Sequence, residues 1–381
     1  MDFSWNPDDQ ALFEGALRFA REELNEGLED RLRERRFCRV AWERLGAFGL
    51  LGASLPESHG GMGLPQPVAA RLVEAVGQGC EDMGLVFSAA AHQFACATPI
   101  ASFGGEAVKD RVLSKLASGD WVGANAITEA GAGSDIARLE TVATRDGDDY
   151  VLDGAKSYVT NGPEADLFLV YATLDRSHGY MGITAFAVER DTPGLTVGNR
   201  FETIGLQTSP IGSVYLEGCR VPASHRVGAE GQGSAIFADS MHHERTCLFA
   251  AYVGAMQRQL DRVVEHARTR SQFRRPIGKF QGVAHRVADM KLRLEAARLL
   301  LYRACWLRER GETATLEVSL AKLAISEAAV QSGLDAIQVF GGAGTMTEMG
   351  VERALRDAVP ATIFSGTSEI QRDLIARELG L

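Results

Sequence analysis

The chain has 381 residues, which is more than one ordinary hydrophobic core accommodates and fits two or three domains. It is 45% hydrophobic, 24% charged and 7% aromatic, a balance typical of a folded globular enzyme rather than of a disordered chain. A net charge of −10 argues against general nucleic-acid binding, which favours a basic surface.

Targeting and cysteine signals are weak. The N-terminus reads MDFSWNPDDQ, without a basic region followed by an apolar one, and no later stretch reaches the ~18 apolar residues of a membrane span. We therefore expect a cytoplasmic protein that does not bind membranes.

The cysteines form no C-x-x-C pair, so neither a metal site nor a disulfide framework is predicted for Cys38, Cys80, Cys96, Cys219, Cys247 and Cys305.

The predicted elements change character twice along the chain. Asn6 and Pro7 predict a helix start, and residues 1–120 continue with helical periodicity. Residues 121–228 contain short apolar, partly β-branched runs that indicate strands at 167–174, 182–188 and 213–221. In residues 229–381 apolar side chains again recur at steps of four and three, as in a helical bundle. No glycine cluster follows a strand with the G-x-G-x-x-G spacing, so a Rossmann dehydrogenase is disfavoured.

Five short motifs occur in a recognisable order. Residues 127–135 read ITEAGAGSD and closely resemble the ITEPGAGSD signature of the acyl-CoA dehydrogenase superfamily, with Ala130 in place of proline. Four further segments resemble later motifs of that family: SYVTNG (157–162), RSQFRRP (270–276), QVFGG (338–342) and GTSEIQR (366–372). The resemblance covers essentially the whole chain. It implies an α+β fold with an N-terminal helical domain, a middle β-barrel domain and a C-terminal four-helix bundle.

The resemblance also implies that FAD binds between the domains and a neighbouring subunit. Thr128 and Thr160 would offer hydroxyl groups to the ring edges of the flavin, and the forked guanidinium of Arg270 suits a diphosphate. Tyr158 replaces the usual tryptophan beside the flavin, and Arg274 stands where the family has glycine. The full set of family cofactor positions is Ile127, Thr128, Ser134, Tyr158, Thr160, Arg270, Phe273, Gln281, Gln338, Gly341, Gly342, Thr367 and Glu369.

A homotetramer, or at least a dimer, follows from the same resemblance. Gln338, Gly341 and Gly342 match a stretch that contacts the FAD of the adjacent subunit in the family.

The family reaction needs a base for the α-proton, while the flavin takes a hydride from the β-carbon. In many members a glutamate immediately precedes GTSE, but this chain has Ser365 there, and a serine needs a partner base. A second family subset carries its glutamate on a helix just before an arginine, which corresponds to Glu244 and Arg245. We therefore predict Glu244 as the catalytic base, with a pKa raised by burial from about 4.3. The alternative is that Glu244 only pairs with Arg245.

Four more particular stretches narrow the resemblance, at residues 82–87, 91–97, 244–251 and 362–368. They resemble L-prolyl-[peptidyl-carrier protein] dehydrogenases, which form pyrrole-2-carboxyl groups for antibiotics and pigments. Replacing a glutamate with Ser365 also leaves space near the α-carbon, as a ring at that carbon requires. We therefore expect two successive oxidations of a carrier-bound prolyl group. Substrate contacts are expected from Ser134, Arg245, Ser365 and Gly366.

An acidic peptidyl carrier protein needs a cationic landing surface. The sequence offers two candidate clusters, one at residues 274–279 with Arg274, Arg275 and Lys279, and one with Arg31, Arg33, Arg35 and Arg36.

Three other functions remain open: a short branched-chain acyl-CoA dehydrogenase, another carrier-protein acyl oxidase, and a non-catalytic flavoprotein scaffold. The electron acceptor, either oxygen or an electron-transfer flavoprotein, is also open.

Overall fold

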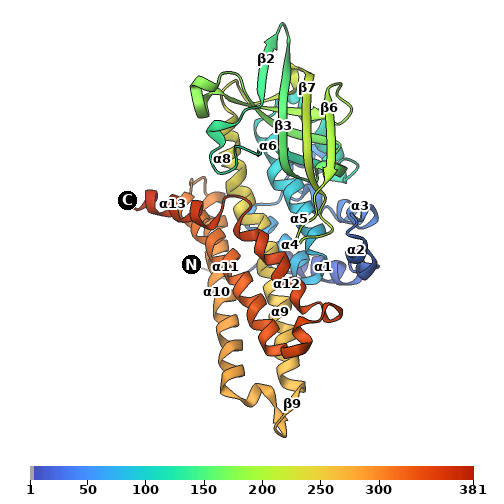
Figure 1. Cartoon of the computed structure of the whole chain (residues 1–381), viewed down its shortest axis with the longest axis vertical. Coiled ribbons are helices and arrows are strands. Elements are labelled where there is room, and N and C mark those ends of the chain that lie inside the picture. Colours follow the sequence, from blue (N-terminus) through green and yellow to red (C-terminus); the bar gives the residue numbers. More distant parts are fainter. Residues whose placement is uncertain (1–3) are drawn as a thin grey trace.

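The structure of the protein is a computed structural model, which describes residues 4–381. Helices occupy residues 7–118, strands dominate residues 123–227, and helices return from residue 233. Figure 1 shows the strands at one end of an elongated molecule, with the long C-terminal helices reaching away to the other end. This order supports the proposed division at residues 120 and 228. No helix in the described part of the chain is long and apolar enough to cross a membrane.

The N-terminal helices pack onto the C-terminal ones. Helix α1 begins at Pro7 as predicted, because the Asn6 side chain accepts a hydrogen bond from the Asp9 N–H at 2.8 Å. Side chains of both helical segments share one hydrophobic core, in which Trp42 and Phe249 are fully buried. The helices are α1 (Pro7–Glu23), α2 (Leu28–Glu34), α3 (Arg39–Phe48), α4 (Gln66–Gly79), α5 (Met83–Ala91), α6 (Thr98–Phe103) and α7 (Glu106–Ser118). Between α5 and α6 the chain stays helical but widens into a π-helical segment, His92–Ala97.

The middle segment is a predominantly antiparallel sheet around its own apolar core. Its strand order is β6-β7-β3-β2-β4-β5-β8, with β1 joined in parallel to β4. Within the described residues the end strands β6 and β8 do not pair with each other. The runs predicted as strands correspond to β4, β5 and β7. The strands are β1 (Gly123–Ala126), β2 (Val142–Asp146), β3 (Asp149–Thr160), β4 (Leu167–Thr173), β5 (Ile183–Glu189), β6 (Leu195–Arg200), β7 (Ile211–Pro222) and β8 (Arg226–Val227).

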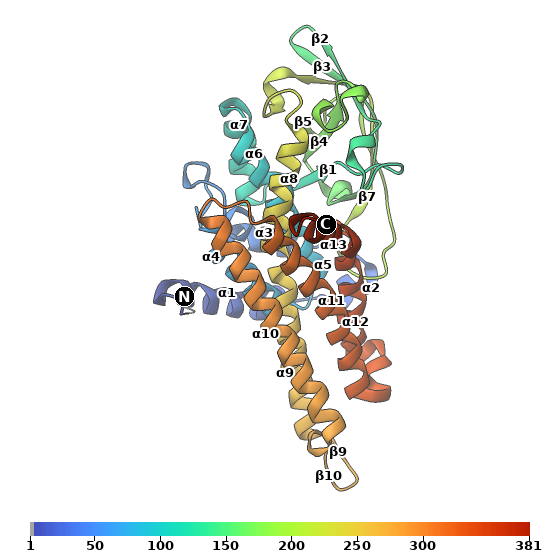
Figure 2. The ribbon, with the colours of Figure 1, turned by 90° about the vertical axis from the view of Figure 1, so that its left-hand side faces the viewer.

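The C-terminal segment is a bundle of long helices. The apolar repeat predicted for α10 is confirmed, because Met290, Leu294 and Leu301 are buried in the bundle core. A short hairpin of β9 (Ser271–Gln272) and β10 (Arg275–Pro276) forms the tip farthest from the sheet (Figures 1 and 2). The helices are α8 (Gly233–His243), α9 (Ala250–Thr269), α10 (Gln281–Glu309), α11 (Thr315–Phe340), α12 (Val351–Ala358) and α13 (Ser368–Glu378).

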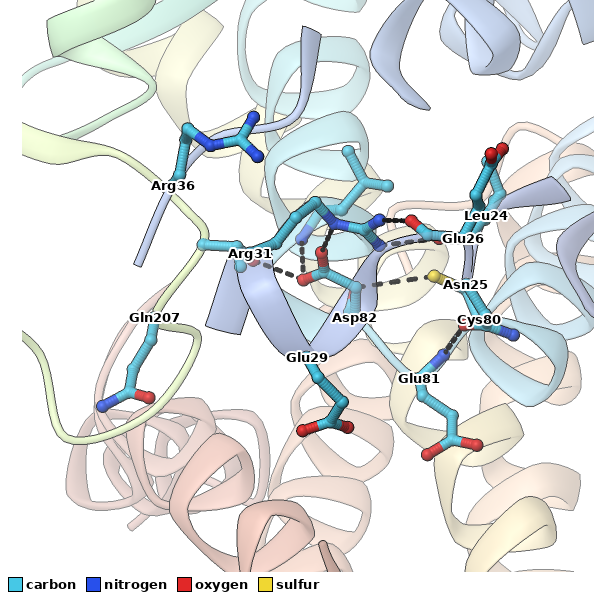
Figure 3. Close-up of polar contacts among 12 residues, drawn as sticks. Leu24, Asn25, Glu26, Glu29, Arg31, Arg36, Cys80, Glu81, Asp82 and Gln207 are labelled. Carbon is cyan, nitrogen blue, oxygen red and sulfur yellow. Dashed lines mark hydrogen bonds and ion pairs between the residues drawn. The ribbon is translucent and has the colours of Figure 1, made fainter. Parts of the chain in front are cut away.

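A buried ion pair ties α2, α5 and the loop before β7 together (Figure 3). The Asp82 carboxylate caps α5 by accepting the Leu85 N–H at 3.1 Å, and it also accepts the Thr208 hydroxyl and, at 3.1 Å, Arg31 Nε. Arg31 is only 3% exposed. The prediction that Arg31 belongs to a carrier landing surface is therefore wrong, because its guanidinium is committed to holding the fold together.

Candidate active site

A cavity of about 750 Å³ lies where the helical segments meet the sheet. Its walls come from α5 and the following π-helical segment, from β1 and the loop after it, from the end of β3, from α8 and from the loop before α13. The sequence motifs far apart in the chain thus converge. The predicted site residues that line the cavity are Ile127, Thr128, Ser134, Tyr158, Thr160, Glu244, Arg245, Ser365, Gly366 and Thr367.

Glu244 stands at the start of a second π-helical segment, Glu244–Leu248, which interrupts the helix between α8 and α9. Thr246 supports this irregular turn, because its hydroxyl donates to the His242 carbonyl at 2.8 Å and accepts from Gln66 Nε2 at 2.7 Å. Single π-helical turns inside α-helices occur frequently at functional sites. Here the irregular turn carries the predicted base into the cavity wall.

The carboxyl group of Glu244 is buried, with 8% of the residue exposed. Burial raises the pKa of Glu244, and the hydrogen bond from the Ser365 hydroxyl and the charge of Arg245 offset only part of that rise. A buried carboxyl group with a raised pKa that borders a cavity is suited to taking a proton from a bound molecule.

The loop before α13 is held against the π-helical segment Glu244–Leu248 by hydrogen bonds. Arg245 Nε donates to the Ser365 carbonyl at 2.8 Å, and Gln371 Nε2 donates to the Gly366 carbonyl at 3.1 Å. Gly366 has a φ of +88°, and a Cβ there would lie 2.9 Å from Gln371 Nε2. Glycine is therefore required at this position by both backbone conformation and space.

The loop after β1 is fixed by a second buried glutamate, Glu129. Its carboxylate accepts Lys156 Nζ at 2.7 Å, the Thr141 hydroxyl at 2.6 Å and two backbone N–H groups, those of Glu140 and Thr141. Burial by itself acts to raise the pKa of Glu129, but the ion pair with Lys156 and the hydrogen bonds outweigh it, so the pKa is lowered. This network holds the ITEAGAGSD loop in the shape that presents Thr128 and Ser134 to the cavity.

The strand side of the cavity offers an open aromatic face and free hydroxyl groups. Tyr158 is 67% exposed and has a φ of +57°, which is uncommon for a residue other than glycine. The hydroxyls of Thr128 and Thr160 form no hydrogen bond within residues 4–381. These groups suit a flat ring with polar edges, such as a flavin.

The remaining predicted cofactor residues do not line the cavity. Glu369 is exposed in the first turn of α13. The others lie at the opposite end of the bundle, where α9 ends and where Phe340 stacks on His266 at 4.0 Å. The helical path from Glu244 to Arg270 spans about 39 Å at 1.5 Å per residue. This distal group, Arg270, Phe273, Gln281, Gln338, Gly341 and Gly342, is exposed, with Phe273 89% exposed.

Neither predicted landing cluster borders the cavity. The 274–279 cluster belongs to the distal hairpin. In the other cluster, each exposed arginine pairs with an acidic side chain: Arg33 with Asp30, Arg35 with Glu202 and Arg36 with Glu34.

Sequence motifs missed several residues that line the cavity. Asn125 is the most informative, because its buried Oδ1 has no hydrogen-bond partner in the described part of the chain. It lies on β1, two residues before Ile127, and both residues line the cavity. His242 also lines the cavity, and burial lowers its pKa to about 4, which keeps it neutral. The other missed lining residues include Phe87, Ala91, Ala95, Phe237, Met241, Tyr180, Asp373 and Arg377.

Sequence profiles of known families match all three segments of the chain. The N-terminal domain of acyl-CoA dehydrogenase matches residues 6–120, the middle domain residues 124–219 and the C-terminal domain residues 231–380. The chain belongs to the acyl-CoA dehydrogenase family. The fold predicted from the five motifs, helical, then β, then helical, is therefore confirmed.

Individual members of the acyl-CoA dehydrogenase family match over nearly the full length. An L-prolyl-[peptidyl-carrier protein] dehydrogenase of Pseudomonas fluorescens is 51% identical over 348 residues, which cover 91% of this chain and 92% of that protein. The structure of the prolyl acyl carrier protein oxidase AnaB has a TM-score of 0.97 and 44% identity, covering 99% of this chain and all of AnaB. The structure of PigA with FAD and proline has a TM-score of 0.98 and 42% identity, covering all of both chains.

Proposed function

We propose that this chain is an FAD-dependent dehydrogenase of an L-prolyl group carried on a peptidyl carrier protein, which it oxidises to a pyrrole-2-carboxyl group. The observation that carries the proposal is Glu244, a buried carboxyl group at a cavity whose strand side presents free hydroxyls and an open aromatic ring. The relatives support the substrate, because their names specify prolyl carrier proteins or proline.

The residues divide the work between the two sides of the cavity. Bound FAD supplies the hydride acceptor. Thr128 and Thr160 would offer their hydroxyls to the polar edge of the flavin ring, and Tyr158 would pack against the ring. Glu244, on the helical side, removes the α-proton of the thioester, and its raised pKa makes it a stronger base than an exposed glutamate. The Ser365 hydroxyl and the charge of Arg245 favour the ionised form of Glu244, which is the form that can accept the proton.

The small side chain of Ser365 supports a substrate that is branched at the α-carbon. A glutamate at this loop position would extend toward the cavity that Glu244 already borders. A five-membered ring closes back onto the α-carbon and needs that volume. The competing function, a short branched-chain acyl-CoA dehydrogenase, uses the same base and cofactor, so the thioester itself must be tested.

We further propose that each FAD site is completed by a second copy of the chain. The distal group lies about 39 Å along the helix from Glu244, and its members are exposed rather than packed. Arg270 at the end of α9 and the glycines after α11 therefore serve the cofactor of a neighbouring subunit. This arrangement supports a dimer as the smallest active unit, within a homotetramer. Size-exclusion chromatography with light scattering tests it, and a flavin-loaded monomer would contradict it.

Anaerobic mixing of the purified FAD-loaded protein with three thioesters tests the function. Flavin absorbance is followed after addition of prolyl-loaded carrier protein, prolyl-CoA or isovaleryl-CoA. Rapid bleaching by the prolyl carrier protein, with slower or no bleaching by isovaleryl-CoA, is the expected result. Preferential bleaching by isovaleryl-CoA would instead establish the branched-chain acyl-CoA reaction. No bleaching by any thioester would identify a non-catalytic flavoprotein.

A further inference from the structure

The Ser365 hydroxyl donates a hydrogen bond to Oε1 of Glu244. Within residues 4–381 it is the only hydrogen bond to the Glu244 carboxyl group. The residue that occupies the usual position of the family base in the loop is thus in direct contact with the predicted base on the helix. Ser365 does more than leave space, because its side chain restricts where the Glu244 carboxyl group can point.

Ser365 is held in place through its hydroxyl, through its carbonyl and through its neighbour Phe364. Its carbonyl accepts Arg245 Nε at 2.8 Å, from the residue next to Glu244 in the chain. Its neighbour Phe364 packs into an aromatic cluster, with ring centroids 4.7 Å from Phe87 and 5.3 Å from Phe249. Ser365 is therefore bonded to two consecutive residues of the helix, to Glu244 through its hydroxyl and to Arg245 through its carbonyl.

The backbone of Ser365 adopts a conformation that only an ordered environment maintains. Its φ of +56° lies in the left-handed region, which costs a residue other than glycine free energy. Glycine would relieve this cost but would lack the hydroxyl. Keeping serine at a position that favours glycine indicates that the side chain has a function.

We propose that Ser365 is a positioning residue, whose hydroxyl orients the Glu244 carboxylate toward the α-hydrogen of the bound thioester. The inference rests on the proposed role of Glu244 as the base. A hydroxyl group suits this task because it donates to the carboxylate before proton transfer and can accept from the protonated acid afterwards. Burial raises the pKa of Glu244, and the same bond opposes this rise, as do the charges of Arg245 and of Lys322 on α11. Variants of Ser365 that lack the hydroxyl remove only the bond and leave both charges in place.

Ser365→Ala and Ser365→Gly test the proposal together. Alanine removes the hydroxyl and keeps the left-handed strain, whereas glycine removes both. The matched control is Ser368→Ala, in the same loop region, because Ser368 Oγ is buried without a hydrogen-bond partner among the described residues. Anaerobic stopped-flow reduction of the flavin is measured across pH with the thioester that reduces the wild-type protein, together with flavin content and thermal stability.

Both Ser365 variants are expected to reduce the flavin about 10-fold more slowly at pH 7, because a Glu244 carboxylate that is no longer oriented toward the α-hydrogen removes the proton more slowly. The acidic limb of their pH profile should move to higher pH, because Glu244 loses the bond that favours its charged form. Flavin content and the Ser368→Ala profile should stay as in the wild type. The proposal would be overturned if the acidic limb stayed at its wild-type pH in both variants. It would also be overturned if the slower reduction were accounted for by a lower flavin content.

Glu244→Gln, measured in parallel, separates this inference from the function on which it rests. If Glu244→Gln still reduces its flavin, Glu244 is not the base, and both the assigned role and the inference fail. If Glu244→Gln is inactive while both Ser365 variants keep the wild-type limb and rate, only the role of Ser365 fails.

Discussion

Glu129, which holds a loop of the site, and Glu244, which lines its cavity, are buried to nearly the same extent, yet their pKa values are shifted in opposite directions. Glu129 is 7% exposed and Glu244 is 8% exposed. Glu129 accepts hydrogen bonds from Lys156, the Thr141 hydroxyl and two backbone N–H groups, and its pKa is lowered. Among the described residues, the Glu244 carboxyl group accepts one hydrogen bond, from Ser365, and its pKa is raised by burial.

Burial alone therefore does not decide what a carboxyl group does. Several donors fix the charge of Glu129 and use it to hold a loop, which makes its contribution structural. Glu244 borders the cavity with few partners, so its charged form is poorly stabilised and its basicity is available to a substrate. The difference is between a carboxylate that accepts four hydrogen bonds from the fold and one that accepts a single hydrogen bond and borders the cavity.

The largest expected effect is that of Glu244→Gln on flavin reduction. Losing a general base slows a proton transfer by about 10²- to 10⁴-fold. The folded protein should be at least as stable as the wild type, because glutamine removes a buried charge with few partners. Stopped-flow reduction and thermal melting measure the two quantities. A large loss of stability with little loss of rate would make Glu244 resemble Glu129 and would abolish the contrast.

Glu129→Gln should act in the opposite sense, chiefly on stability. It leaves the buried ammonium group of Lys156 without its countercharge, and breaking a buried ion pair costs about 3 kcal/mol. Urea denaturation gives the free energy of unfolding. The double variant Glu129→Gln, Lys156→Met should recover part of the loss, because no buried charge is then left unpaired. No recovery in the double variant would contradict the ion-pair explanation.

The two glutamates should also shift stability in opposite directions with pH. The lowered pKa of Glu129 means that its stabilisation is present above its unfolded pKa and is lost as pH falls through the folded pKa. The raised pKa of Glu244 means that the folded state favours its protonated form, so stability falls as pH rises from the unfolded value, about 4.3, through the folded one. Melting temperatures of wild type, Glu129→Gln and Glu244→Gln, taken from about pH 2.5, below the unfolded pKa of about 4.3, up to about pH 8, measure this. Parallel curves for the two variants would refute the opposite signs.

The smallest expected effect is that of Thr141→Val, which removes one of several donors to Glu129. The two side chains have similar shapes, so the loss should be about 1 kcal/mol of unfolding free energy, the value of a typical hydrogen bond. Flavin reduction should be unchanged. Comparing this variant with Ser365→Ala contrasts removal of one donor among several with removal of the single side-chain donor to Glu244. A rate loss in Thr141→Val as large as in Ser365→Ala would show that loop position, not donor number, controls the base.

Much of the fold followed from the sequence because its signals are local. The cap at Asn6, the strand runs and the apolar repeat of α10 each depend on neighbouring residues. The motif order then indicated the family. Which glutamate serves as base was predicted from an arginine neighbour and from the serine at the usual loop position. The structure places Glu244 at the cavity, and its role as base stays a prediction.

The contacts between distant residues were not predictable in the same way. No motif showed that Ser365 and Glu244, far apart in the chain, share a hydrogen bond, or that Glu129 pairs with Lys156. The sequence placed Arg31 in a surface cluster with other arginines, yet Arg31 is buried and forms an ion pair with Asp82. Asn125 carries no motif at all. Such contacts depend on tertiary packing, which brings polar partners together irrespective of their sequence spacing.

The separation of Glu244 from the distal group has a genetic consequence. If each cofactor site combines Glu244 of one subunit with Arg270 of another, a subunit damaged at Glu244 and a subunit damaged at Arg270 are each inactive alone. A mixed dimer of the two contains one site with both defects and one site with neither. Co-expression of two inactive variants, one altered at Glu244 and the other at Arg270, should then restore part of the activity. Such interallelic complementation would reveal the shared site without a structure of the assembly.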